Sequence, residues 1–144
     1  MAKIPEFLHE PVSNAFPKNP CFIGTVQPDG WAQFSPRGSV VVLDEETIGY
    51  WDRGSGSTHD GVEDGSKVMV FFRSPELGAS RVLPLGGIAR FYGIATVHNE
   101  GAGRELVWNK MIEHERDKDP EKKGRAVILK IERAEDLYRK PLQG

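Results

Sequence analysis

The sequence predicts a mostly β protein, an antiparallel barrel of about six or seven strands with helices packed on its outside. Strand-like segments follow one another along the chain and are joined by short turns, as in antiparallel hairpins. The chain has 16 glycines and 10 prolines, which favour many turns. Its 144 residues fit one domain, so we expect a single domain over residues 1–144.

The N-terminal half is expected to contain one helix and five strands. The helix covers residues 4–13 and is limited by Pro11. The strands are the apolar segments at residues 21–26, 31–35, 39–43, 47–51 and 67–73. Asp29-Gly30 predicts a hairpin turn between the first two strands, because glycine tolerates positive φ. Pro36 is expected to bend the chain, because proline cannot continue a central ladder.

The C-terminal half is expected to add strands around one long helix. Its expected elements are a loop at 75–80, an extended segment at 81–85, strands at 88–97 and 126–131, and a tail at 134–144. Alternating apolar residues predict the first of these strands, in which Gly93 marks a bulge or a close backbone approach. Residues 101–115 carry an apolar stripe at helical spacing. The barrel therefore spans about residues 20–132.

Composition narrows the possible partners and the compartment. The net charge is −2, from 19 basic and 21 acidic residues, so we expect neither a nucleic-acid partner nor a membrane surface. No apolar run approaches the ~20 residues of a membrane span. The single cysteine, Cys21, excludes an internal disulfide and is expected to be a buried structural thiol. These features predict a cytoplasmic protein.

A candidate anion site lies between residues 33 and 67. Arg37 occupies the turn before one strand, and Arg53 begins the Gly/Ser/Thr-rich loop after the next. Glycines let backbone N–H groups turn toward an anion, and Ser57 or Thr58 would N-cap a short helix through Asp64. Composition alone favours a solvated turn between two strands over an anion site, because Gly/Ser loops are common.

Other chemistry-bearing patterns are weak. The four histidines, His9, His59, His98 and His114, show no metal-ligand spacing, so no metal site is expected. The sequence has no nucleophile–histidine–acid order and no dinucleotide fingerprint, so any chemistry would belong to a cofactor. Trp31 and Trp51 are expected to pack in the barrel, and Trp108 and Met111 to lie in helix core or at a dimer contact.

Four stretches in this order carry a family resemblance. They are Phe22-Ile-Gly-Thr-Val-Gln-Pro-Asp-Gly30, Gln33-Phe-Ser-Pro-Arg37, Ile48-Gly-Tyr-Trp51 followed by Lys67-Val-Met-Val-Phe-Phe72, and Arg90-Phe-Tyr-Gly-Ile-Ala-Thr-Val97. With them, the chain resembles the pyridoxamine 5'-phosphate oxidase-like, FMN-binding split-barrel proteins. The resemblance rests on the ordered series over most of the chain, from about residue 20 to 132.

The resemblance implies a six-stranded antiparallel split barrel that forms a homodimer, with FMN in clefts at the interface. By position, Ser35 and Arg37 would lie along the ring and ribityl chain, where backbone amides through Gly38 would donate to the ring. Tyr50 and Trp51 would end the strand beside the flavin. The phosphate would be bound by Arg53, Ser57 and Thr58.

Two departures from the family pattern shape the functional hypothesis. Thr58-His59 stands where many members have an Arg-Lys pair. The phosphate would then be held by Arg37, Arg53 and backbone amides, with His59 as a further candidate, and a deazaflavin stays open as the cofactor. The chain also lacks the C-terminal extension that holds pyridoxal phosphate, so pyridoxamine phosphate oxidase activity is not expected.

We therefore expect an FMN-dependent oxidoreductase that passes electrons between a nicotinamide and a small substrate, with no catalytic residue assigned. The alternatives are a deazaflavin-dependent reductase, a non-catalytic flavin carrier, a haem-binding protein with His9 or His98 as axial ligand, and an interaction module without a cofactor.

Overall fold

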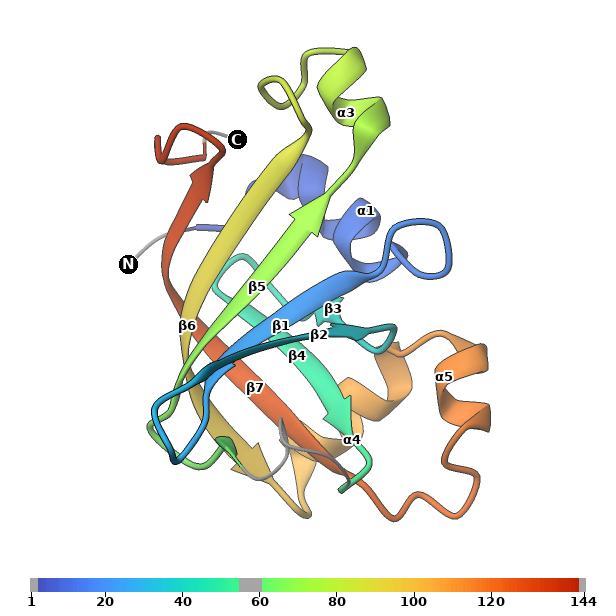
Figure 1. Ribbon diagram of the computed structural model, residues 1–144. Coiled ribbons are helices and arrows are strands. Elements are labelled where there is room, and N and C mark those ends of the chain that lie inside the picture. Colours follow the sequence, from blue (N-terminus) through green and yellow to red (C-terminus); the bar gives the residue numbers. More distant parts are fainter. Residues whose placement is uncertain (1–2, 55–60, 143–144) are drawn as a thin grey trace.

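A seven-stranded antiparallel sheet, curled into a half-barrel, forms the framework of the protein (Figure 1). The computed structural model describes residues 3–54 and 61–142. The strands are β1 (Cys21–Val26), β2 (Ala32–Arg37), β3 (Val41–Val42), β4 (Thr47–Asp52), β5 (Lys67–Arg73), β6 (Ile88–His98) and β7 (Arg125–Asp136). Their order across the sheet is β2-β1-β5-β6-β7-β4-β3. The prediction of a mostly β, split-barrel fold is confirmed, with seven strands in place of six.

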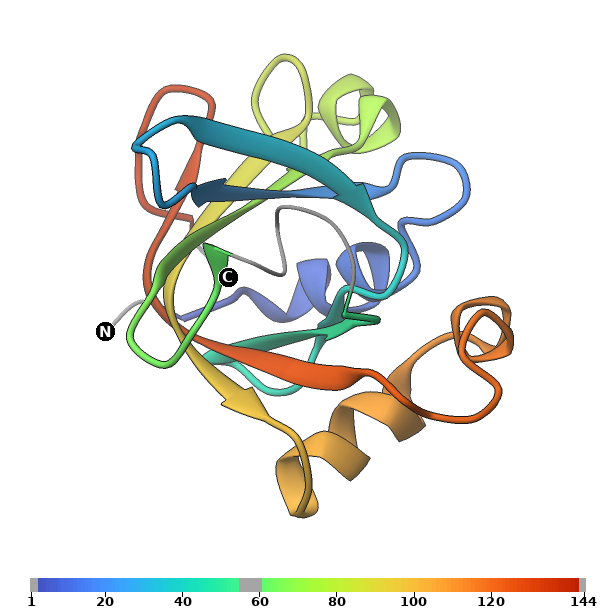
Figure 2. The ribbon, with the colours of Figure 1, turned by 60° about the horizontal axis from the view of Figure 1, so that its bottom comes forward.

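Short helices surround the sheet. They are a 3₁₀ turn at Glu6–Leu8 followed by α1 (His9–Ser13), then α3 (Pro75–Ala79), α4 (Ala102–Lys110) and α5 (Glu113–Asp117). Figure 2 shows α1 within the curve of the sheet and α4 outside it, beside β4 and β7. Within residues 3–54 and 61–142, none of the helices combines the length and the apolarity needed to cross a bilayer.

The core fills the inside of the curve, with alternate residues of β1, β5 and β6 and nearly all of β4 buried. In β6, Ala89, Phe91 and Ala95 are completely buried, as the alternating pattern predicts. The register of β6 against β7 shifts between Tyr92 and Gly93, which confirms the expected bulge. A Cβ at position 93 would lie only 3.0 Å from the carbonyl oxygen of Lys130, so glycine is needed for this close approach.

The expected long helix over residues 101–115 is interrupted, and this expectation was wrong. Met111 and Ile112 both have extended backbone, with ψ of 149°, and they separate α4 from α5. The Met111 side chain is buried in a small core with Val107 and Trp51. Arg116 donates a hydrogen bond to the Met111 carbonyl at the break.

Two expected irregular segments between β5 and β6 also differ. Residues 75–80, expected as a loop, form α3, because the Ser74 hydroxyl accepts a hydrogen bond from Leu77 N at 3.2 Å and Pro75 suits the first helical turn. Residues 81–85, expected to be extended, turn back so that Leu83 N bonds to Leu77 O at 3.1 Å. The turn buries the Leu83 side chain, so no strand is needed to bring it into the core.

Strand boundaries shift where pairing overrides local signals. Pro36 lies inside β2, paired with Phe22, because β2 is an edge strand on which a missing N–H is tolerated. Strand β7 continues to Asp136, opposite Ala89, and so takes in the start of the expected tail. The strand expected at 39–43 shortens to β3. Trp31 was expected in the barrel but is 76% exposed beside the β1–β2 turn.

Candidate functional site

Two side chains at and just after the end of β2 connect it to β4, where no backbone ladder joins the two strands. The Ser39 hydroxyl accepts a hydrogen bond from Trp51 N at 3.0 Å and donates one to Trp51 O at 3.2 Å. The Arg37 guanidinium also donates to Trp51 O, at 3.4 Å. A directed polar cluster therefore occupies the split in the barrel.

A small polar pocket opens at this split. It has a volume of about 80 Å³ and is lined by Pro36, Arg37, Gly38, Ser39, Trp51, Arg53, Glu115 and Lys118. Three of these side chains are cations and one is a carboxylate, so the pocket is positively charged. Pockets for whole ligands measure ~300–1,000 Å³, so this one fits a phosphate-sized group and not a ring system.

The pocket brings together four of the eight residues that the sequence singled out: Arg37, Gly38, Trp51 and Arg53. Ser35 lies farther back on β2, where its hydroxyl accepts a hydrogen bond from the Gln33 amide at 3.3 Å. Ser57 and Thr58, and the start of the helix expected there, lie outside the described residues. The cofactor contacts of all eight residues stay a prediction.

Tyr50 faces the core and not the pocket surface. Its side chain is completely buried, and its hydroxyl has no hydrogen-bond partner within the described ranges. The Arg37 guanidinium lies 5.7 Å from the centre of its ring. Burial raises the pKa of Tyr50 above its usual value, and the positive charge of Arg37 only partly offsets this. A ligand in the pocket would meet Arg37 before it met this phenol.

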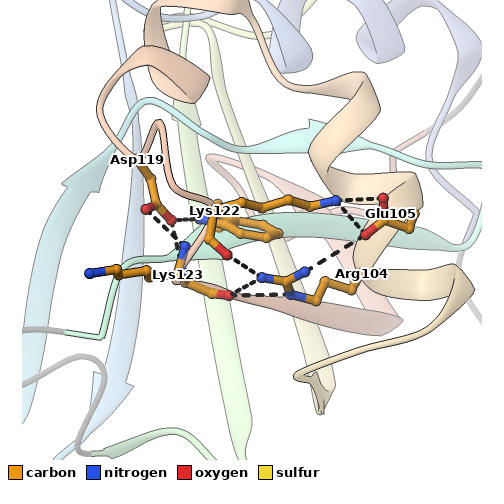
Figure 3. Close-up of polar contacts among 7 residues, drawn as sticks. Arg104, Glu105, Asp119, Lys122 and Lys123 are labelled. Carbon is orange, nitrogen blue, oxygen red and sulfur yellow. Dashed lines mark hydrogen bonds and ion pairs between the residues drawn. The ribbon is translucent and has the colours of Figure 1, made fainter.

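Trp51 lies beneath the pocket and ties it to the segment after α5. Its indole N–H donates to Asp119 Oδ2 at 2.8 Å, and the ring packs against Trp108 at 4.9 Å between ring centres. Asp119 also accepts hydrogen bonds from the backbone N–H groups of Lys123 and Gly124 (Figure 3). Burial by itself would raise the pKa of Asp119, but these hydrogen bonds outweigh it and lower the pKa.

Arg104 reinforces the same segment. Its guanidinium donates to the carbonyl oxygen of Lys122, 2.5 Å from Nη2 (Figure 3), and to that of Gly124, 2.9 Å from Nη2. The Lys122 ammonium in turn pairs with Glu105 on α4. The chain after α5 is therefore fixed to α4 and to β4 at the same time, which holds α5 beside the pocket.

Sequence reasoning missed the contribution of α5. Glu115 is the last residue of the helix expected over 101–115 and Lys118 follows it, and their i, i+3 spacing is that of an ordinary surface pair. They reach the pocket because the chain breaks at Met111 and folds back, which no local pattern signals. Ser39 was seen only as the start of a strand.

A larger apolar groove runs over the outer face of the sheet. Its volume is about 660 Å³. It is lined by residues of β1, β2, β5, β6 and β7, among them Phe34, Met69, Tyr92 and Ile94. Phe34 stacks on Phe22 at 5.0 Å and is 51% exposed. Strand β2 borders both cavities, the groove through Phe34 and the pocket through Pro36.

The histidines considered for haem are engaged elsewhere. His9 Nε2 lies 2.9 Å from Ile4 O, and His98 Nε2 lies 2.8 Å from Thr96 Oγ1. Neither lines the pocket or the groove. His59 is outside the described residues. Over residues 3–54 and 61–142, no three His, Cys, Asp or Glu side chains lie close enough to hold a metal ion.

No protein-family model and no curated protein matches this chain. Solved structures do match. HupZ of Group A Streptococcus is 22% identical, covering 98% of this chain and 99% of that one, with a TM-score of 0.71. A putative pyridoxamine 5'-phosphate oxidase from Lactobacillus delbrueckii is 24% identical, covering 93% and 98%, with a TM-score of 0.62. An FMN-binding protein from Syntrophomonas wolfei is 15% identical, covering 95% and 89%, with a TM-score of 0.66.

These similarities confirm the split-barrel fold of the pyridoxamine 5'-phosphate oxidase-like proteins that the sequence resemblance implied. At such identities they establish the fold and leave the function to be argued from the site.

Proposed function

We propose that this protein binds FMN and holds its phosphate in the pocket formed by Arg37 and Arg53. The observation that carries the proposal is the pocket itself: Arg37 at the end of β2 and Arg53 directly after β4 line the same opening of phosphate size. A planar guanidinium suits the geometry of phosphate oxygens. The FMN-binding protein that shares this fold supports the choice of flavin.

We further propose that a second copy of the chain covers the apolar outer face and completes the flavin site. Val26 and Phe34 line the apolar groove and are exposed by 61 and 51%, and Trp31, in the turn between β1 and β2, is 76% exposed, which is unusual for large apolar side chains. Strand β2 is also an unpaired edge of the sheet. In a symmetric dimer through this face, the apolar groove of each protomer would lie against the other protomer, beside the edge strand β2.

In this proposal the protein is an oxidoreductase that transfers electrons between a nicotinamide and a small substrate. Bound FMN would supply the hydride chemistry. The protein's own contribution is to fix the phosphate with Arg37 and Arg53 and to offer an apolar face against which a ring system can exclude water. The role is tested by adding NADH or NADPH to the flavin-loaded protein without oxygen and following the loss of flavin absorbance.

The binding proposal is tested by titrating apoprotein with FMN and following the quenching of flavin fluorescence. Loss of a hydrogen bond to a charged group costs about 1.5–3 kcal/mol, so Arg53→Ala should weaken FMN binding about 10- to 100-fold. Arg73→Ala, which removes an exposed arginine at the α3 end of β5, is the matched control and should bind FMN normally. Equal affinity of the two variants would refute the site.

Mass spectrometry of the compound released by heat identifies the cofactor. An F420 reductase also shares the fold, and a deazaflavin with a phosphate group would use the same pocket. A haem-binding protein from Mycobacterium smegmatis shares it too, with a TM-score of 0.51, but here His9 and His98 lie away from both cavities. A colourless protein that binds neither FMN nor haem would favour an interaction module.

A further inference from the structure

One wall of the polar pocket comes from α5, which is far from Arg37 and Arg53 in the sequence. Glu115 projects from this helix and Lys118 follows its end, and both line the pocket. The Glu115 carboxylate contacts the Lys118 ammonium, with 3.0 Å between Oε2 and Nζ. The pocket therefore contains its own anion and a cation paired with it.

Glu115 is placed where an incoming anion would have to approach the backbone of Gly38. Its side chain is 9% exposed, and apart from the ion pair with Lys118, Oε2 receives no hydrogen bond from any described residue. A Cβ on Gly38 would lie 2.6 Å from that oxygen, so the carboxylate rests directly against the glycine. A buried carboxylate is stabilised only when its charge is compensated. Here the compensation comes from cations that a phosphate would also use.

Lys118 is held in position and is not a freely solvated charge. Its ammonium lies 5.1 Å from the centre of the Phe16 ring, on which His114 also stacks at 5.0 Å. The next residue, Asp119, is fixed to the Trp51 indole. Because both sides of Lys118 are anchored, its charge is already directed at the pocket before a ligand arrives.

We propose that Lys118 is the third phosphate-binding cation of this pocket, and that Glu115 is an internal counter-ion which a phosphate ester replaces on binding. The proposal rests on the proposed function and adds the residues that set its affinity. In the free protein Lys118 pairs with Glu115. In the complex the same ammonium pairs with the phosphate, and the carboxylate moves out toward solvent. Glu115 thus lowers the affinity for phosphate esters and Lys118 raises it.

The test measures FMN and riboflavin affinities of four variants by flavin fluorescence. Removing a like charge about one side chain away from the phosphate should strengthen FMN binding roughly tenfold in Glu115→Gln, and removing the cation should weaken it roughly tenfold in Lys118→Met. Riboflavin has no phosphate, so its affinity should not change in either variant. Glu113→Gln is the control on the exposed side of the same helix. Arg53→Ala reports on the pocket itself.

Inorganic phosphate added as a competitor provides an independent readout. It should displace FMN from Glu115→Gln at lower concentration than from the unchanged protein. If Arg53→Ala weakens FMN binding while Glu115→Gln and Lys118→Met leave it unchanged, the role of α5 is refuted and the FMN site stands. If all three leave it unchanged, the phosphate site is itself wrong. Equal effects on riboflavin and FMN would show a structural role and would also overturn the proposal.

Discussion

Replacement of Asp119 by alanine should destabilise the protein and loosen one wall of the pocket. The carboxylate accepts three hydrogen bonds: from the Trp51 indole at 2.8 Å, Lys123 N at 3.0 Å and Gly124 N at 2.8 Å. Alanine would leave the indole N–H buried without an acceptor and would free the backbone of the segment after α5. The lost bonds are all made to an ionised group.

The size of the effect follows from the buried donors. An unsatisfied buried donor costs about 1–3 kcal/mol, and at least the Trp51 indole and the Gly124 amide are buried. Partial rehydration reduces the sum, so we expect a loss of about 2–4 kcal/mol in the free energy of unfolding. For a chain of this length that corresponds to a melting temperature lower by roughly 10 °C.

The assay is thermal unfolding followed by circular dichroism, with denaturant unfolding as a second measurement. Asp117→Ala, an exposed aspartate two residues earlier, is the control and should unfold like the unchanged protein. Asp119→Asn keeps the shape and one acceptor oxygen and should fall between them. If Asp119→Ala melts within about 2 °C of the control, a shift worth less than 1 kcal/mol, the hydrogen bonds to Asp119 do not stabilise the segment.

The pH dependence of stability gives a second check on Asp119. Its pKa is lowered from 3.8 in the folded protein, so the folded state holds the proton less tightly than the unfolded state. The stabilisation is therefore complete above pH 3.8 and is lost as the pH falls through the lowered folded value. Asp119→Ala should show a smaller loss of stability over this acid range.

Three further outcomes are expected from the same structure. Gly93→Ala should lower the free energy of unfolding by about 1–3 kcal/mol, because its Cβ would meet backbone and side-chain atoms at 3.0 Å. Gly24→Ala, with its nearest atoms at 3.4 Å, should cost less, and denaturant titration compares the two variants. Burial raises the pKa of the Cys21 thiol to about 12, so Cys21 should react with a disulfide reagent only after unfolding. Because the unfolded thiol ionises more readily, the contribution of Cys21 to stability should decline as the pH rises above 9. Phe34→Glu should convert the proposed dimer to a monomer in sedimentation velocity. Tyr138→Glu changes a similarly exposed residue outside the groove and should leave the dimer intact. If the unchanged protein is itself monomeric, the dimer is refuted.

The sheet was accessible from the sequence because its signals are local. Residues 21–26 and 67–73 were expected as strands and form β1 and β5 with the same bounds. Their apolar content and flanking turns decide the outcome without knowledge of the partner strand. Gly30 takes the positive φ of 91° that the hairpin signal requires. The bulge at Gly93 could likewise be inferred from a single glycine in a strand pattern.

The candidate site was only partly accessible, because its second half depends on tertiary contacts. Arg37 and Arg53 could be singled out, since both flank predicted strands. Tyr50 shows the limit of that reasoning: the alternation along β4 does not tell which face is inside when both neighbours are buried. Glu115 and Lys118 could not be found at all, because a helical pattern continues through the point where Met111 breaks the helix.

The split in the barrel explains why the cations gather where they do. In a closed barrel the two edge strands, β2 and β3, would pair through backbone hydrogen bonds and leave no split for side chains to fill. Here Ser39 and Arg37 satisfy the Trp51 backbone instead, and the strands stay far enough apart to leave a pocket between them. The same Trp51 anchors the chain after α5 through Asp119. Trp51 thus holds both the Arg37 side and the α5 side of the pocket in place. The position of the pocket's charged side chains therefore depends on the packing of the fold beneath them.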